Sequence, residues 1–178
     1  MNEVAREYGG ALFALAVEQE LCDALLSETE AVQGLLLSSP DYIKLLASPE
    51  IPLAERERAL VSAFGEANGY LLNFLRMMVT RGYARALPDA LNEFGRLYRE
   101  RFGIELAVIQ SAAPLSDAEK ERLVLALRRR VGKEISPLYR VEPELLGGIR
   151  VEVGGVLYDG TLRRRLDGLS DSLSELTL

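Results

Sequence analysis

The sequence lacks histidine entirely and contains a single cysteine, Cys22, among its 178 residues. Without histidine, the chain has no imidazole general base, no Ser-His or Cys-His nucleophile pair and no imidazole metal ligand. A single cysteine excludes an intrachain disulfide and is typical of proteins in reducing compartments. No basic residues are arranged in the sequence to activate the thiol of Cys22, so we expect it to be a packing residue.

Motifs for catalysis or cofactor binding are also absent. The sequence contains no GxGxxG, GxxxxGK[ST], HExxH or CxxC pattern, and Gly132-Lys133 lacks the other residues of a phosphate loop. The many carboxylates do not cluster in an apolar stretch, where burial would tune them for acid–base chemistry. We therefore expect no catalytic residues, no cofactor and no metal.

Long hydrophobic runs are missing as well. No run approaches the roughly 20 apolar residues that span a bilayer, and residues 1–20 lack the features of a signal peptide. We expect a soluble chain that reaches a membrane only through a partner. The formal net charge of −6 disfavours a protein that binds nucleic acid or an acidic membrane surface. A hydrophobic content of 48% supports a real core, in one ordinary domain or two small ones.

Six stretches in the first half of the sequence have the apolar periodicity of short helices. Ser39-Pro40 is typical of a helix start, with Ser39 as the cap and Pro40 in the first turn. Gly65 and Gly82 are typical helix stops. Short helices joined by short loops indicate a helical bundle. We expect helices over residues 3–19, 21–37, 42–47, 52–64, 68–81 and 88–101.

Two of these helices carry wider apolar arcs than one buried face requires. The arc of helix 3–19 covers about 200°, and Gly9-Gly10 within it costs roughly 1 kcal/mol per glycine. Either this helix packs closely against another helix of the chain, or it lines a groove that admits a partner helix. Helix 68–81 is apolar over roughly 220°, so it is either central or buries one edge against a partner. Met77 and Met78 suit a core or an adaptable contact surface.

After Gly103 the pattern changes from helical to strand-like. Residues 104–113 and 135–141 are rich in strand-forming residues. Ser116 and Glu119 form a capping-box pattern, which predicts a helix between the two strands. The cluster Arg128-Arg129-Arg130 lies near the end of that helix, where positive charge is favourable. It indicates either a solvated face or an anion site. We expect the helix to bury Leu123, Val124, Leu127 and Val131.

The stretch from Leu145 to Leu169 contains the densest local signals. Alternating apolar residues over 149–153 predict a strand, Gly154-Gly155 predicts a two-residue hairpin turn, and residues 156–158 form the return strand. Asp159-Gly160-Thr161 supplies N-cap oxygens for a following helix. Its apolar stripe comprises Leu162, Leu166, Leu169, Leu173 and Leu176.

This ordered pattern, GG-I-R-V-x-V-G followed by D-G-T-x-R-x-x-L, resembles the C-terminal signature of the delta subunit of F-type ATP synthases. The mitochondrial counterpart of that family is the oligomycin-sensitivity-conferring protein. The family also has a Tyr-Ala-x-Ala-Leu pattern near its start, which Tyr8, Ala11 and Leu12 match and from which Gly9 departs. The resemblance implies an α+β fold that is mostly α. A six-helix N-terminal bundle would occupy residues 1–103, and a small α/β C-terminal domain residues 104–178.

The resemblance also implies a function. Members of the family are non-catalytic stator subunits of the peripheral stalk, which join the catalytic head to the membrane-anchored b subunits so that proton-driven rotation is coupled to ATP synthesis. The N-terminal domain would bind N-terminal helices of alpha subunits, and the C-terminal domain would bind the b subunits. The chain would then be peripheral to the cytoplasmic face of a bacterial cell membrane, attached only through partner subunits and without nucleic acid.

Site residues follow from the same resemblance, position by position. The groove between the first and fifth helices would be lined by Tyr8, Ala11, Leu12, Leu15, Tyr70, Asn73 and Met77. The C-terminal motif positions are Gly147, Gly148, Asp159, Arg163 and Leu166, most of which we expect to have structural roles.

One alternative from another functional class is a small RNA-associated or enzymatic α/β domain. It would use the arginine clusters at residues 128–130 and 163–165. The acidic net charge argues against it.

Overall fold

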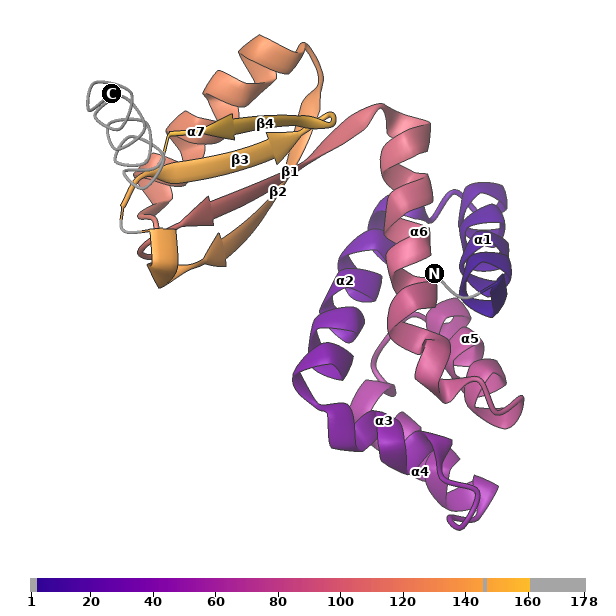
Figure 1. The fold of residues 1–178 in the computed structure, drawn as a ribbon. Helices are drawn as coiled ribbons and strands as arrows, with labels where there is room; N and C mark the ends of the chain where they lie inside the picture. The colour runs from indigo at the N-terminus through magenta and orange to yellow at the C-terminus, as the bar shows by residue number, and fades with distance from the viewer. Residues whose placement is uncertain (1–2, 146, 161–178) are drawn as a thin grey trace, which may run out of the picture. The chain divides into compact units, whose positions relative to one another are not determined.

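A computed structural model describes residues 3–145 and 147–160 of the chain (Figure 1). The residues group into two compact units that divide between Tyr98 and Arg99, within the last helix of the first unit. The boundary predicted from the change in periodicity, after Gly103, lies slightly later. The described residues are mostly helical with one small sheet, which confirms the predicted α+β, mostly α class. No helix among them is long and apolar enough to cross a bilayer.

The first unit is built from helices at the segments where periodicity predicts them. Asn68 caps α5 by accepting a 2.9 Å hydrogen bond from the Tyr70 backbone N–H. Ser39 precedes α3 as predicted, but its side chain makes no capping hydrogen bond, so Pro40 is the main start signal there. The elements are α1 (Glu3–Glu18), α2 (Cys22–Ser38), α3 (Pro40–Ala47), α4 (Leu53–Phe64), α5 (Gly69–Thr80), the short 3-10 helix η1 (Ala84–Ala86) and α6 (Leu87–Phe102).

The core of the first unit explains the wide apolar arc of α5. This helix is largely interior, since five of its apolar side chains are buried: Leu71, Phe74, Leu75, Met78 and Val79. Met77 is only half-buried and packs at the edge of the core. The two methionines therefore differ in role: Met78 is a core residue, and Met77 faces the surface.

Gly9 accounts for part of the unusual composition of α1. It is buried, and a Cβ atom at this position would lie against the Ala90 carbonyl oxygen and 2.8 Å from the Glu93 Cβ of α6. Close packing of α1 on α6 thus requires glycine here. At Gly10 a Cβ would meet only Leu97 Cδ1, at 4.0 Å. Of the two interpretations left open for the glycine pair, close packing within the chain explains Gly9 and leaves Gly10 without a structural requirement.

The second unit is a four-stranded sheet in the order β2-β1-β3-β4, with α7 packed on one face (Figure 1). β1 pairs parallel with β2 and antiparallel with β3, which pairs antiparallel with β4. A parallel pair needs a crossover, and α7 supplies it. The elements are β1 (Ile104–Ser111), α7 (Asp117–Val131), β2 (Glu134–Val141), the 3-10 helix η2 (Pro143–Leu145), β3 (Ile149–Val153) and β4 (Val156–Asp159).

Local sequence signals predict the helix start, the hairpin turn and the helix–sheet core of this unit. Ser116 and Glu119 form both bonds of the predicted capping box at the start of α7. Gly154 and Gly155 both adopt positive φ, 58° and 74°, between the paired residues Val153 and Val156, which confirms the two-residue hairpin. The core under α7 contains Leu127, with Leu123, Val124 and Val131 packed around it, as predicted. The leucine-striped helix predicted after Gly160 lies outside the described residues.

Candidate functional site

Helices α1 and α5 meet at both ends through polar contacts. The Tyr70 hydroxyl at the start of α5 donates a 3.0 Å hydrogen bond to Gln19 Oε1, just beyond the end of α1. Arg81, just beyond the end of α5, donates a 2.9 Å hydrogen bond from Nη1 to the Tyr8 hydroxyl in the first half of α1. The start of each helix is therefore matched with the end of the other, and the two helices run antiparallel.

An aromatic cluster fixes the second of these ends. The Arg81 guanidinium carbon lies 5.9 Å from the centre of the Tyr8 ring, and the Tyr8 and Tyr83 rings are 5.6 Å apart. Tyr83 follows the end of α5 and is 38% exposed. Gln19, Arg81 and Tyr83 were not among the residues nominated from the sequence. Gln19 and Arg81 are the polar last residues of the predicted helices 3–19 and 68–81, so they do not belong to the apolar arcs, and Tyr83 lies beyond the second helix.

Six of the seven residues nominated for a partner groove reach the surface. Tyr70 is 40% exposed, and Ala11 and Asn73 are exposed as well. Leu12 is the exception: it is only 2% exposed and belongs to the buried stripe Ala5, Gly9, Leu12 and Ala16. The helical period places Leu12 against the core, so Leu12 packs inside the first unit and does not contribute to the surface. We define the α1–α5 surface by the exposed or half-buried residues Tyr8, Ala11, Leu15, Tyr70, Asn73 and Met77.

The C-terminal motif residues that the structure describes lie in the β3–β4 ladder and in the turn before β3. Asp159 pairs with Arg150 across the β3–β4 ladder, with a 3.3 Å separation between Oδ2 and Nη2, and its side chain is only 9% exposed. Gly147 and Gly148 adopt φ values of 127° and 81°, which side chains with a Cβ rarely reach. These observations agree with the structural roles expected for Asp159 and the two glycines. Arg163 and Leu166 lie outside the described residues.

The sheet face opposite α7 carries apolar side chains on both sides of the exposed residue Glu152. In the ladder register, Leu138 of β2 lies beside Val108 of β1, Val108 beside Glu152 of β3, and Glu152 beside Leu157 of β4. Leu138 and Leu157 are exposed, and Val108 is half-buried. Leu106, two residues before Val108 on the same face, is exposed too. We call Leu106, Val108, Leu138 and Leu157 the open sheet face.

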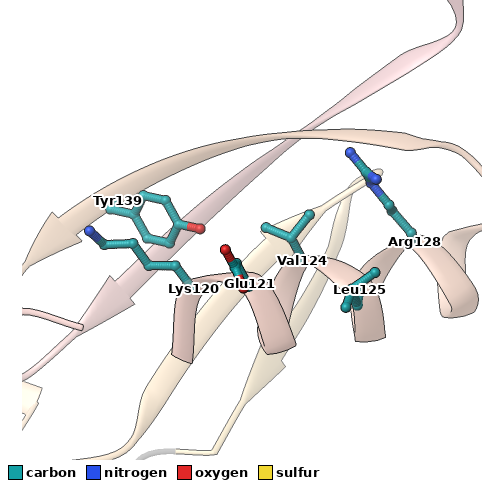
Figure 2. Close-up of a pocket in the computed structure, with 6 residues that line it drawn as sticks. All are labelled: Lys120, Glu121, Val124, Leu125, Arg128 and Tyr139. Carbon is teal, nitrogen blue, oxygen red and sulfur yellow. The ribbon is translucent and has the colours of Figure 1, made fainter. Parts of the chain in front are cut away.

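A hollow of about 400 Å³ lies between α7 and β2, lined by the six residues drawn in Figure 2. The Lys120 ammonium lies 5.6 Å from the centre of the Tyr139 ring, and burial raises the pKa of Tyr139. Arg128 forms a 2.7 Å ion pair with Glu134. These contacts stabilise the fold, and the lining residues contain no nucleophile paired with a base.

The same region shows what two arginines of the cluster at residues 128–130 contact. Arg128 is bound to Glu134, and the Arg130 guanidinium carbon lies 4.6 Å from the centre of the Tyr158 ring. Two of the three arginines thus have partners within the chain, and all three are exposed, which favours the solvated face over the anion site. In the described part of the chain, no group of three or more histidine, cysteine, aspartate or glutamate residues is arranged to hold a metal ion.

Comparison with known proteins gives a consistent result. The family model for the ATP synthase delta (OSCP) subunit matches residues 4–173. The chain is 34% identical to the ATP synthase subunit delta of Gloeobacter violaceus over 176 residues, which cover 97% of this chain and 95% of that protein. It is 30% identical to the corresponding subunit of Clostridium kluyveri over 162 residues, which cover 90% of both chains.

A solved structure shares the fold. A chain in the cryo-EM structure of the Toxoplasma gondii mitochondrial ATP synthase hexamer superposes with a TM-score of 0.70 at 21% identity, over 97% of this chain and 98% of that one. Because the family model matches nearly all of the sequence and the curated relatives match it along most of their own length, the chain belongs to the ATP synthase delta (OSCP) subunit family.

Proposed function

We propose that this chain, a non-catalytic peripheral-stalk subunit of an F-type ATP synthase, holds an alpha-subunit N-terminal helix on its α1–α5 surface. The observation that carries the proposal is that apolar and aromatic side chains reach the surface, half-buried or exposed, along two antiparallel helices. Exposed patches of this kind mark interaction sites. In this proposal the six helices of the first unit act as one bundle that presents the surface.

The chemistry of the α1–α5 surface suits a helical partner. Met77 and Leu15 are half-buried apolar side chains, and Ala11 is small enough to allow close approach. An amphipathic helix in such a place contributes apolar anchors at positions i, i+3 or i+4, and i+7. Tyr70 and Asn73 add polar groups at the edge, which fix orientation.

A stator must stay attached while torque is applied, so binding is expected to be nanomolar or tighter, about −12 kcal/mol or more. Met77→Glu and Leu15→Glu place a charge in the apolar contact and should each weaken binding of an alpha-subunit N-terminal peptide by at least about tenfold. Isothermal titration calorimetry measures the affinity, and circular dichroism measures the fold. Leu37→Glu is the matched control, because Leu37 lies on α2 and is 61% exposed. Unchanged affinity in both folded variants would contradict the assignment of the surface.

We further propose that the second unit binds the b subunits of the stalk through the open sheet face. Parallel strand pairs are normally covered on both faces, yet α7 covers only one face of the β1–β2 pair. Leu138, together with Val108 and Leu106, offers an apolar patch to an amphipathic helix of the stalk, and Glu152 separates Leu157 from this patch. Leu138→Asp should weaken pull-down by the b subunits, whereas Leu125→Asp, in the hollow of Figure 2, should not. The reverse outcome would assign the b subunits to the hollow.

This function places the chain at the cytoplasmic face of a bacterial membrane, attached through the b subunits and not by its own insertion. Nucleic acid has no part in it. The alternative of an RNA-associated or enzymatic domain receives no support, because the family match covers the domain that would perform it and Arg128 and Arg130 are engaged within the chain. Co-purification of alpha and b subunits with the tagged chain from membranes tests the whole proposal, and their absence would refute it.

A further inference from the structure

The α1–α5 surface has an uneven distribution of charge along its length. Residues 7–43 contain no lysine or arginine, so α1 and α2 together present only acidic charges over that span. At the end where α1 finishes and α5 begins, Glu18 and Glu20 flank Gln19, which accepts the hydrogen bond from Tyr70. Both carboxylates are exposed. This end therefore carries negative charge on each side of a contact that joins the two helices.

Two more carboxylates lie at the same end. Glu28 of α2 accepts a 2.6 Å hydrogen bond from the backbone N–H of Asn68, the residue that caps α5. Glu66 is exposed and lies two residues before Asn68 in the sequence. Glu28 and Glu66 also line a hollow with residues of α2 and α4, so we call only Glu18 and Glu20 the acidic end of the surface.

The opposite end carries charges of both signs. Arg81 binds the Tyr8 hydroxyl there, and Glu7 is exposed one residue before Tyr8. The two ends of one apolar surface thus differ in net charge.

From this asymmetry we infer how charge is arranged along the bound helix, which we call its polarity. Its basic side chains lie over the acidic end, beside Glu18 and Glu20, and its apolar anchors lie over Met77 and Leu15. The inference rests on the proposed function, because it takes the alpha-subunit helix as the occupant. Charges act mainly on register and orientation in such interfaces, since like charges brought together are penalised. Glu7 and Glu18 are separated by about 16 Å along α1, which exceeds the screening length of about 10 Å at 0.1 M salt. The two ends therefore act on different parts of the partner.

A charge-reversal pair tests the polarity in the full-length chain. Glu18→Lys should weaken binding of a synthetic alpha-subunit N-terminal peptide by about three- to tenfold in 0.1 M salt, the range for reversing an exposed ion pair. Glu7→Lys is the matched control, since it makes the same change on an exposed residue of the same helix at the other end, and it should change affinity less than about twofold. Raising the salt to about 1 M should remove most of the Glu18→Lys effect.

Compensation gives the sharper readout. Each basic residue of the peptide is changed to glutamate in turn, and one such change should restore affinity with Glu18→Lys but not with Glu7→Lys. Restoration with Glu7→Lys alone, or equal effects of the two substitutions, overturns the inferred polarity. If Met77→Glu abolishes binding while Glu18→Lys has no effect, the polarity fails and the proposed function stands. If the wild-type chain does not bind the peptide at all, both fail.

Discussion

The neighbouring glycines Gly9 and Gly10 give the most discriminating test of how the first unit is packed. Both lie inside α1, where replacing glycine by alanine improves helix propensity by about 1 kcal/mol. Their surroundings differ: a new Cβ at Gly9 would press on the Ala90 carbonyl oxygen and lie 2.8 Å from Glu93 Cβ, whereas at Gly10 it would meet Leu97 Cδ1 at 4.0 Å. We therefore expect opposite signs for the two substitutions.

The free-energy cost of Gly9→Ala depends on whether α6 is able to move away from α1. Glu93 is 1% exposed, and its two carboxylate oxygens each accept a 2.8 Å hydrogen bond from Arg96. Those hydrogen bonds hold the pKa of Glu93 below its ordinary value and restrict the side chain. The neighbouring atom at Ala90 is backbone, so relief requires a shift of the whole helix. Overpacking of this kind typically costs 1–3 kcal/mol, and we expect about 3 kcal/mol here because the obstacle is the backbone of α6. After the propensity gain, Gly9→Ala should destabilise the first unit by about 2 kcal/mol.

For a unit of roughly 100 residues, 1 kcal/mol shifts Tm by about 4–8 °C. Gly9→Ala should therefore lower the helical melting transition of the full chain by about 8–16 °C, and Gly10→Ala should raise it by up to about 8 °C. Circular dichroism at 222 nm follows the transition, and urea unfolding measures the free energy independently. Stabilisation by both substitutions would show that α1 does not press on α6 at Gly9, and the packing argument would be refuted.

Two further predictions concern other parts of the fold. Gly148→Asp should lower the stability of the second unit by about 1 kcal/mol, because φ is 81° at this position; a variant that melts like the wild type yet loses the b subunits would make the site a contact. Tyr98 donates a 2.6 Å hydrogen bond to Asp23, which, with burial and the Asp23 charge, raises its pKa to about 12. The stabilising effect of this hydrogen bond should be complete below the ordinary tyrosine pKa of 10.0 and be lost as pH rises through about 12. One tyrosine should titrate near that pH by ultraviolet absorbance and be missing in Tyr98→Phe, which should also cost about 1 kcal/mol of stability.

The features that the sequence predicts well are those decided by a few neighbouring residues. The capping box of Ser116 and Glu119 forms because both partners lie within one helical turn. The hairpin at Gly154-Gly155 forms because both glycines adopt the positive φ that the turn requires. Strand order is different, since the sequence contains no local signal that β1 pairs with both β2 and β3. The partner of Asp159 likewise depends on the β3–β4 register, which brings Arg150 opposite it.

The width of an apolar arc predicts that the helix is buried, but it does not distinguish burial in the core of the chain from burial against a partner. On α5 the chain itself covers most of the arc, because Leu71, Phe74, Leu75, Met78 and Val79 are all buried without any partner. On α1 the same is true of the stripe that contains Leu12. What remains for a partner is the narrow edge that includes Tyr70 and Met77, and neither periodicity nor hydrophobicity distinguishes this edge from the core. The distinguishing feature is polar: Tyr70 is bound to Gln19 and stays 40% exposed, and a residue of this kind belongs at an interface rim and not in a core. Under the proposed function, an apolar arc indicates a partner surface where tyrosine or arginine contacts such as these border it.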